Sequence, residues 1–159
     1  MGLDAIVHCN CFETGKLKEP PPYPELVSLT ADGSLEFHST DLETLLALDR
    51  WLDYRACRHQ SGILLHHRIG NIATVGLLRA ELAREPAKFP VLLQQVLYNG
   101  WHAGDCLSLE DVVLVRNELN CLTTFACADP TKREYVEWFR QQMLELADAS
   151  QQVGKPIAF

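Results

Sequence analysis

The spacing of apolar side chains changes along this chain, and this change constrains the fold more than any other feature of the sequence. Leu3, Ala5 and Val7 occupy every second position, which is the period of a β-strand. After residue 40, apolar residues recur three and four positions apart, which is the period of an α-helix. We therefore expect an α+β fold with about five helices packed on a small, mostly antiparallel sheet.

The predicted strands are short and lie near both ends of the chain. They are expected at residues 3–12, 26–30 and 34–38, with a further strand at 156–159. At 159 residues the chain is long enough to bury a stable core without disulfide bonds, and we expect one globular domain over residues 1–159.

A hairpin is predicted around Asp32-Gly33. A two-residue loop would place Leu29 opposite Glu36, whereas a three-residue loop pairs Leu29 with Leu35. The longer loop keeps apolar residues opposite one another, so we expect it, with Gly33 in the left-handed region.

Capping residues and breakers predict where the helices begin and end. We expect helices that begin at a capping box of Thr40 and Glu43, at Asn71, at Phe89, at Ser108 and at Asp129-Pro130. The first should end near Asp53, the second at Glu85, the third at Gly100 and the last at Gly154. Residues 63–67, before the second helix, fit a strand and a first helical turn equally well.

Each predicted helix has an apolar face. The inward residues are expected to be Leu42, Leu45, Leu46 and Leu52 in the first helix; Phe89, Leu92, Leu93, Val96 and Leu97 in the third; Val112, Val115, Leu119 and Leu122 in the fourth; and Val136, Phe139, Met143 and Leu146 in the last.

Charge and hydropathy exclude several classes of function. Asp and Glu outnumber Lys and Arg by 21 to 14, for a net charge of −7, and the basic residues are scattered. This argues against nucleic acid and anionic membranes as partners and favours a basic protein partner. The sequence has neither an apolar run of membrane-spanning length nor a secretory pattern, so we expect a cytoplasmic location and reduced cysteines.

Two short pairs of residues supply candidate metal ligands. Cys9-x-Cys11 and Cys57-x-His59 together offer three thiolates and one imidazole, a common donor set for Zn²⁺. The C-x-C spacing differs from the C-x2-C turns of zinc ribbons. The alternative, which we favour on the sequence, is that Cys9 and Cys11 extend the buried apolar face of the first strand.

A second set of polar residues suggests a cleft. Histidines change charge near neutral pH and serve as acids, bases or ligands. The candidate cleft residues are His66, His67, Arg68, Asn71, His102 and Asp105. The alternative is that each forms its own hydrogen bonds at the edge of the core.

Several stretches resemble a family of small bacterial proteins with no assigned function. They are MGLDAIVHCNCFETG, GILLHHRIGNIATVGLLRAEL, NGWHAGD and VGKPIAF. The resemblance implies a bacterial cytosolic origin and assigns no activity, cofactor or site residue.

The sequence favours a non-catalytic binding or regulatory module over an enzyme. Common nucleotide-binding and hydrolase motifs are missing, and the small, acidic, helix-rich character is similar to that of toxin-neutralising immunity proteins. The alternative is a zinc protein, structural or hydrolytic, that uses Cys9, Cys11, Cys57 and His59. A third hypothesis is an enzyme that uses the cleft histidines.

Overall fold

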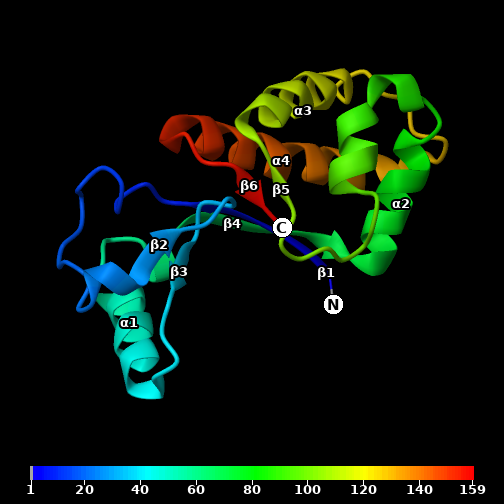
Figure 1. Ribbon diagram of the computed structural model, residues 1–159. Helices are drawn as coiled ribbons and strands as arrows, with labels where there is room; N and C mark the ends of the chain where they lie inside the picture. Colours follow the sequence, from blue (N-terminus) through cyan, green and yellow to red (C-terminus); the bar gives the residue numbers. More distant parts are fainter. Residues whose placement is uncertain (1) are drawn as a thin grey trace.

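A four-stranded antiparallel sheet forms the centre of the computed structural model, which describes residues 2–159 (Figure 1). The strand order is β4-β1-β6-β5. β1 (Gly2–His8) and β4 (Ile63–Asn71) pair along most of their length, whereas β6 (Ile157–Ala158) and β5 (Cys106–Leu107) are short. The α+β prediction is confirmed, and β6 places the C-terminal residues in the sheet.

The first strand is shorter than predicted. It ends at His8, not at Phe12, because its pairing with β4 shifts register after Val7 and the chain then turns. The turn is closed by a backbone hydrogen bond of 2.9 Å from the Lys16 N–H to the Cys11 carbonyl. Cys11 is buried, as expected, but it lies in the turn after β1, so the prediction that Cys9 and Cys11 extend the face of the strand is wrong.

The predicted hairpin forms a separate two-stranded sheet. β2 (Val27–Leu29) and β3 (Leu35–Phe37) pair in the expected register, with Leu29 opposite Leu35. Gly33 has a φ of 85°, as the three-residue loop requires.

Four α-helices and one π-helical turn make up the main helical elements of residues 2–159. They are α1 (Leu42–Tyr54), α2 (Ile72–Leu82), the π-helical turn Leu92–Val96, α3 (Leu109–Cys121) and α4 (Arg133–Val153). Residues 63–67 belong to β4, which settles the ambiguity before α2. None of these helices combines the length and hydropathy that a bilayer span requires.

Several predicted helix ends are confirmed, but α2 ends at Leu82 and not at Glu85, and the third helix is only a π-helical turn that ends at Val96 and not at Gly100. Ser108 caps α3 by accepting a hydrogen bond from the Asp111 N–H, and Gly154 ends α4 with a φ of 67°. The capping box at Thr40 is wrong by one residue. Asp41 is the N-cap of α1, because its carboxylate reaches the Thr44 N–H at 2.9 Å.

The inward faces of α3 and α4 are as predicted, but that of α1 is not. Leu42 and Leu46 are 68% and 44% exposed, while Leu48 and Trp51 are the buried residues of α1. The indole N–H of Trp51 also donates to the Glu19 carbonyl at 2.9 Å. α1 therefore turns Trp51 toward the proline-rich loop, residues 15–24, and leaves Leu42 and Leu46 in solvent, while Leu45 and Leu52 are half-buried.

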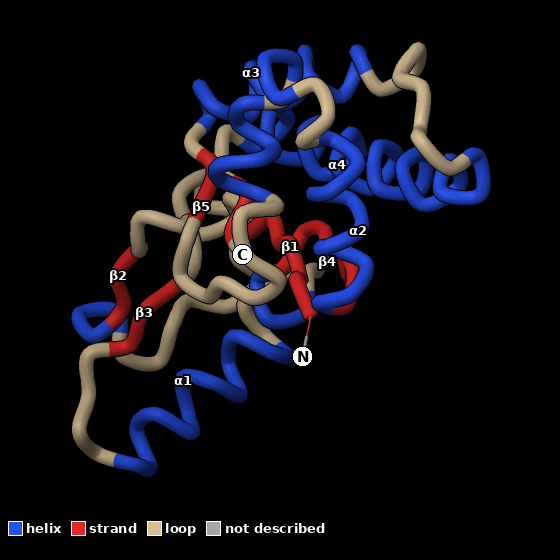
Figure 2. Tube along the Cα trace, turned by 90° about the vertical axis from the view of Figure 1, so that its right-hand side faces the viewer, coloured by secondary structure: helices blue, strands red, loops and turns tan. Residues whose placement is uncertain are grey.

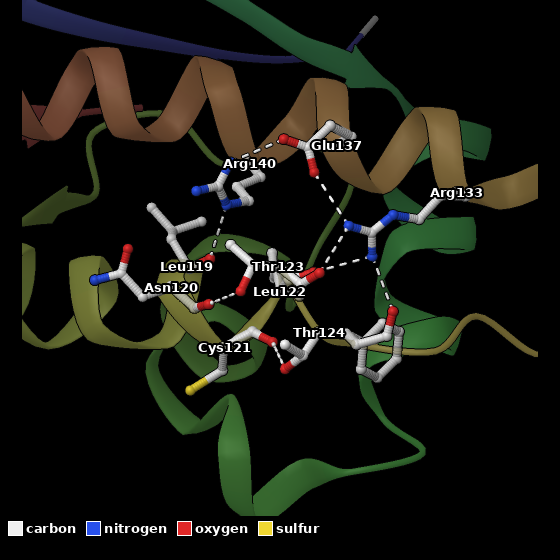
Figure 3. A network of polar contacts seen from close by, with 10 residues as sticks. Leu119, Asn120, Cys121, Leu122, Thr123, Thr124, Arg133, Glu137 and Arg140 are labelled. Atoms are coloured by element: carbon white, nitrogen blue, oxygen red, sulfur yellow. Dashed lines mark hydrogen bonds and ion pairs between the residues drawn. The ribbon is translucent and has the colours of Figure 1, made fainter.

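Two arginines of α4 hold the C-terminal end of α3 (Figure 3). Arg133 Nη1 donates to the Leu122 carbonyl at 2.9 Å, and Arg140 Nε donates to the Leu119 carbonyl at 3.2 Å. Glu137 accepts from both guanidinium groups. Each of these two carbonyls also accepts a long backbone hydrogen bond, the Leu119 carbonyl from the Leu122 N–H at 3.2 Å and the Leu122 carbonyl from the Phe125 N–H at 3.3 Å, so the arginines add a second, charged donor.

Replacing Arg133 by methionine should therefore lower the free energy of unfolding by about 1–3 kcal/mol, because several carbonyls lose a charged donor. Urea denaturation measures the change. The matched control is Arg116→Met, since Arg116 contacts Asp148 at the surface and such pairs contribute about 0–1 kcal/mol. Equal losses in the two variants would contradict this role for Arg133.

The main core lies between the sheet and helices α2 to α4. Within the described residues, no member of this core falls between positions 9 and 62. That segment, here called the insertion, leaves the sheet after β1 and returns at β4. In Figures 1 and 2 its helix α1 and hairpin β2–β3 project away from α2, α3 and α4.

Candidate metal centre

Four side chains from the two ends of the insertion meet at one point. Cys9 and Cys11 follow β1, and Cys57 and His59 lie between α1 and β4. One ligand atom from each residue can be chosen so that all four atoms lie within 4.8 Å of one another. The structure thus brings together the four residues that the sequence suggested as metal ligands.

Three of the six distances between ligand atoms match the edges of a tetrahedral metal site, and all six are within 4.8 Å. Cys9 Sγ lies 3.8 Å from Cys57 Sγ, and His59 Nδ1 lies 3.5 Å from Cys11 Sγ and 3.7 Å from Cys57 Sγ. Zn–S bonds of about 2.3 Å and Zn–N bonds of about 2.0 Å place tetrahedral ligands about 3.5–3.8 Å apart. These three pairs therefore need little rearrangement to share one ion.

Backbone hydrogen bonds give each ligand pair its local shape. The Cys9 N–H donates to the Gly62 carbonyl at 2.8 Å, which joins the two ends of the insertion beside the cluster. The His59 N–H points at Cys57 Sγ, 3.4 Å away. This contact fixes the position of the Cys57 sulfur relative to the backbone of His59.

A buried lysine holds the loop that carries Cys11. Lys155 is only 4% exposed, and its Nζ donates to the Gly33 carbonyl at 3.2 Å and pairs with Glu13. A Cβ on Gly33 would lie 2.9 Å from Lys155 Cδ, so the hairpin packs directly on this side chain. Lys155 therefore fastens both the cysteine loop and the hairpin to the C-terminal segment.

Burial shifts the pKa of three residues of the cluster, Cys9, Cys11 and His59. It raises the pKa of Cys9 to about 12, and it also raises the pKa of Cys11. Burial and the nearby Arg58 hold the pKa of His59 below its usual range, so the imidazole is neutral, as a ligand must be. A bound cation would therefore displace protons from the cysteine thiols.

One contact changes when His59 Nδ1 binds a metal. Arg58 Nε donates to His59 Nε2 at 3.2 Å. A metal on Nδ1 of a neutral imidazole places the ring proton on Nε2. Arg58 would then have no acceptor at that nitrogen.

The predicted cleft histidines of β4 have separate partners. His66 contacts Asp4 at 3.2 Å and is exposed, whereas His67 Nε2 contacts Glu145 at 2.8 Å on α4. Adjacent strand residues face opposite sides of a sheet. Arg68 is exposed.

The other cleft candidates also serve local structure. Asn71 caps α2 by accepting from the Thr74 N–H at 2.9 Å. His102 is buried, with Nε2 at 3.0 Å from the Val96 carbonyl and Nδ1 at 3.4 Å from Asp105. The described contacts place these residues in neighbourhoods different from those of the β4 histidines.

Sequence reasoning missed three basic residues beside the cluster. Lys16, Lys18 and Arg58 line a groove together with Cys9, Cys11 and His59. The sequence did contain a signal for them, because Lys16 and Lys18 follow the first ligand pair and Arg58 lies between Cys57 and His59.

The comparisons with known proteins add nothing to this geometry. No family model, curated protein or solved structure matches the chain. Function is therefore inferred from the residues and their arrangement.

Proposed function

We propose that Cys9, Cys11, Cys57 and His59 bind one Zn²⁺ ion, and that the ion fastens the insertion to the sheet. The observation that carries this proposal is the meeting of four donor atoms within 4.8 Å, drawn from the two ends of the insertion. The ligand pairs lie far apart in sequence, so an ion that joins them closes a long loop.

The donor set favours zinc in a structural role. Three thiolates and one imidazole suit tetrahedral Zn²⁺, whereas Mg²⁺ and Ca²⁺ prefer oxygen ligands. Structural zinc sites have four protein ligands, while catalytic sites keep one position open for water. A site filled by all four residues therefore supports the structural alternative over the hydrolytic one.

Apart from the contacts of Lys155, few buried side chains hold the insertion in place. Its buried apolar side chains are Cys11, Pro21, Leu48, Trp51, Ala56 and Cys57, and two of these are proposed ligands themselves. A segment with so small a core needs a further source of stability, and structural zinc supplies about 10–16 kcal/mol in small peptides. We infer that the metal supplies it here.

Elemental analysis of protein purified without an affinity tag tests the proposal. We expect about one zinc per chain. After replacement by Co²⁺, we expect thiolate-to-cobalt charge-transfer bands together with the strong visible bands of a tetrahedral ion. Protein that holds no metal as purified, and binds neither Zn²⁺ nor Co²⁺ on reconstitution under reducing conditions, would contradict it.

A structural ion performs no reaction, so the proposal is compatible with the non-catalytic module expected from the sequence. The net charge of −7 still motivates a basic protein partner. That partner stays a prediction.

A further inference from the structure

A polar groove of about 440 Å³ lies against the candidate metal centre. Its volume falls within the range of about 300–1,000 Å³ typical of small-molecule sites. Its lining residues are Cys9, Asn10, Cys11, Lys16, Lys18, Arg58, His59, Leu64, Gln152 and Val153.

The groove concentrates positive charge in an acidic chain. Lys16, Lys18 and Arg58 line it, and no Asp or Glu does. Eight of the 14 Lys and Arg residues form ion pairs with carboxylates in the described part of the chain, but these three form none. All three are exposed.

The positive charge of Lys16, Lys18 and Arg58 exceeds the negative charge of a metal centre that holds Zn²⁺. A Zn²⁺ ion with three thiolates and a neutral imidazole carries one net negative charge. Lys16, Lys18 and Arg58 together carry three positive charges, so the groove keeps a net charge of about +2 when the ion is bound. The groove therefore keeps a positive charge when the metal centre is filled.

We propose that this groove binds a small ligand through a phosphate group. A phosphate monoester carries about −1.5 to −2 charges near pH 7, which matches the charge of the groove, whereas a single carboxylate carries one. The guanidinium of Arg58 offers a planar fork for two phosphate oxygens, and the lysines act as point charges beside it. This inference goes beyond the structural role of the metal.

A titration with inorganic phosphate tests the proposal on the full-length, metal-analysed protein. Backbone amide NMR shifts are followed at constant ionic strength, with sodium chloride as the balancing salt. We expect saturable shifts centred on residues 16–18 and 58, and weaker binding of acetate. Shifts that fail to saturate, or acetate binding as tight as phosphate binding, would overturn it.

Paired variants show whether the groove cations are responsible. Lys16→Gln/Lys18→Gln should weaken phosphate binding about tenfold or more, because two charged donors are lost. Arg50→Gln/Arg68→Gln is the control, since it removes two exposed cations that lie outside the groove and lack carboxylate partners. Equal weakening in both double variants would count against the groove.

The metal content of each variant separates this inference from the proposed function. Phosphate binding with no metal bound would overturn the zinc site and leave the groove standing. Bound zinc without phosphate binding would support the zinc site and overturn the proposed phosphate site in the groove.

Discussion

Replacing Cys57 by alanine should reduce zinc affinity by about a hundredfold or more. Cys57 Sγ lies 3.8 Å from Cys9 Sγ and 3.7 Å from His59 Nδ1, so it is close to a ligand from each pair. If about 10–16 kcal/mol of binding free energy is shared over four ligands, each is worth roughly 3 kcal/mol. A competition titration with a chromophoric chelator measures the loss.

The matched control is Cys121→Ala, which removes an exposed thiol at the end of α3, outside the cluster. This variant should keep one zinc per chain and the affinity of the unmodified protein. If Cys57→Ala binds zinc as tightly as Cys121→Ala does, Cys57 is not a ligand and the four-residue site is wrong.

Removing the metal with a chelator should loosen the insertion while the main core stays folded. Trp51 reports this change, because it is 3% exposed, whereas Trp101 and Trp138 are 56% and 42% exposed. We expect its fluorescence to shift to longer wavelength as the indole meets water. Amide hydrogen exchange should accelerate in residues 9–62, since the metal-binding free energy of about 10–16 kcal/mol no longer holds that segment.

Two controls make this result specific. The fluorescence shift should disappear in Trp51→Phe, which keeps the metal ligands. Amides of α3 and α4 should keep their protection, because they pack in a core that contains no residue of the insertion. Unchanged exchange in residues 9–62 after complete metal removal would refute the stapling role.

Local signals predicted much of the fold. The faces of α3 and α4, the Ser108 cap and the Gly154 stop all follow from side chains close to one another in sequence. The hairpin register followed from pairing Leu29 with Leu35. These predictions succeeded because the interactions that decide them act within a few residues.

Predictions failed where distant segments decide the outcome. Alternation predicts a strand over residues 3–12, but pairing with β4 ends at His8 and a turn begins. Helical periodicity predicts that Leu42, Leu45, Leu46 and Leu52 face inward on α1. The buried residues are instead Leu48 and Trp51, and Trp51 donates to the Glu19 carbonyl of the proline-rich loop. Periodicity predicts which residues share one face of a helix or strand, but not which segment of the chain packs on that face.

The candidate centre shows the same division. The residue types alone named a plausible zinc donor set, because few side chains bind metals and their chemistry is local. The choice between buried packing residues and converging ligands required the return of the chain at β4, which brings Cys57 and His59 to Cys9 and Cys11. Sequence therefore determined which atoms are available for binding. Only the tertiary structure decided that they meet, because the long-range strand pairing brings the two ends of the insertion together.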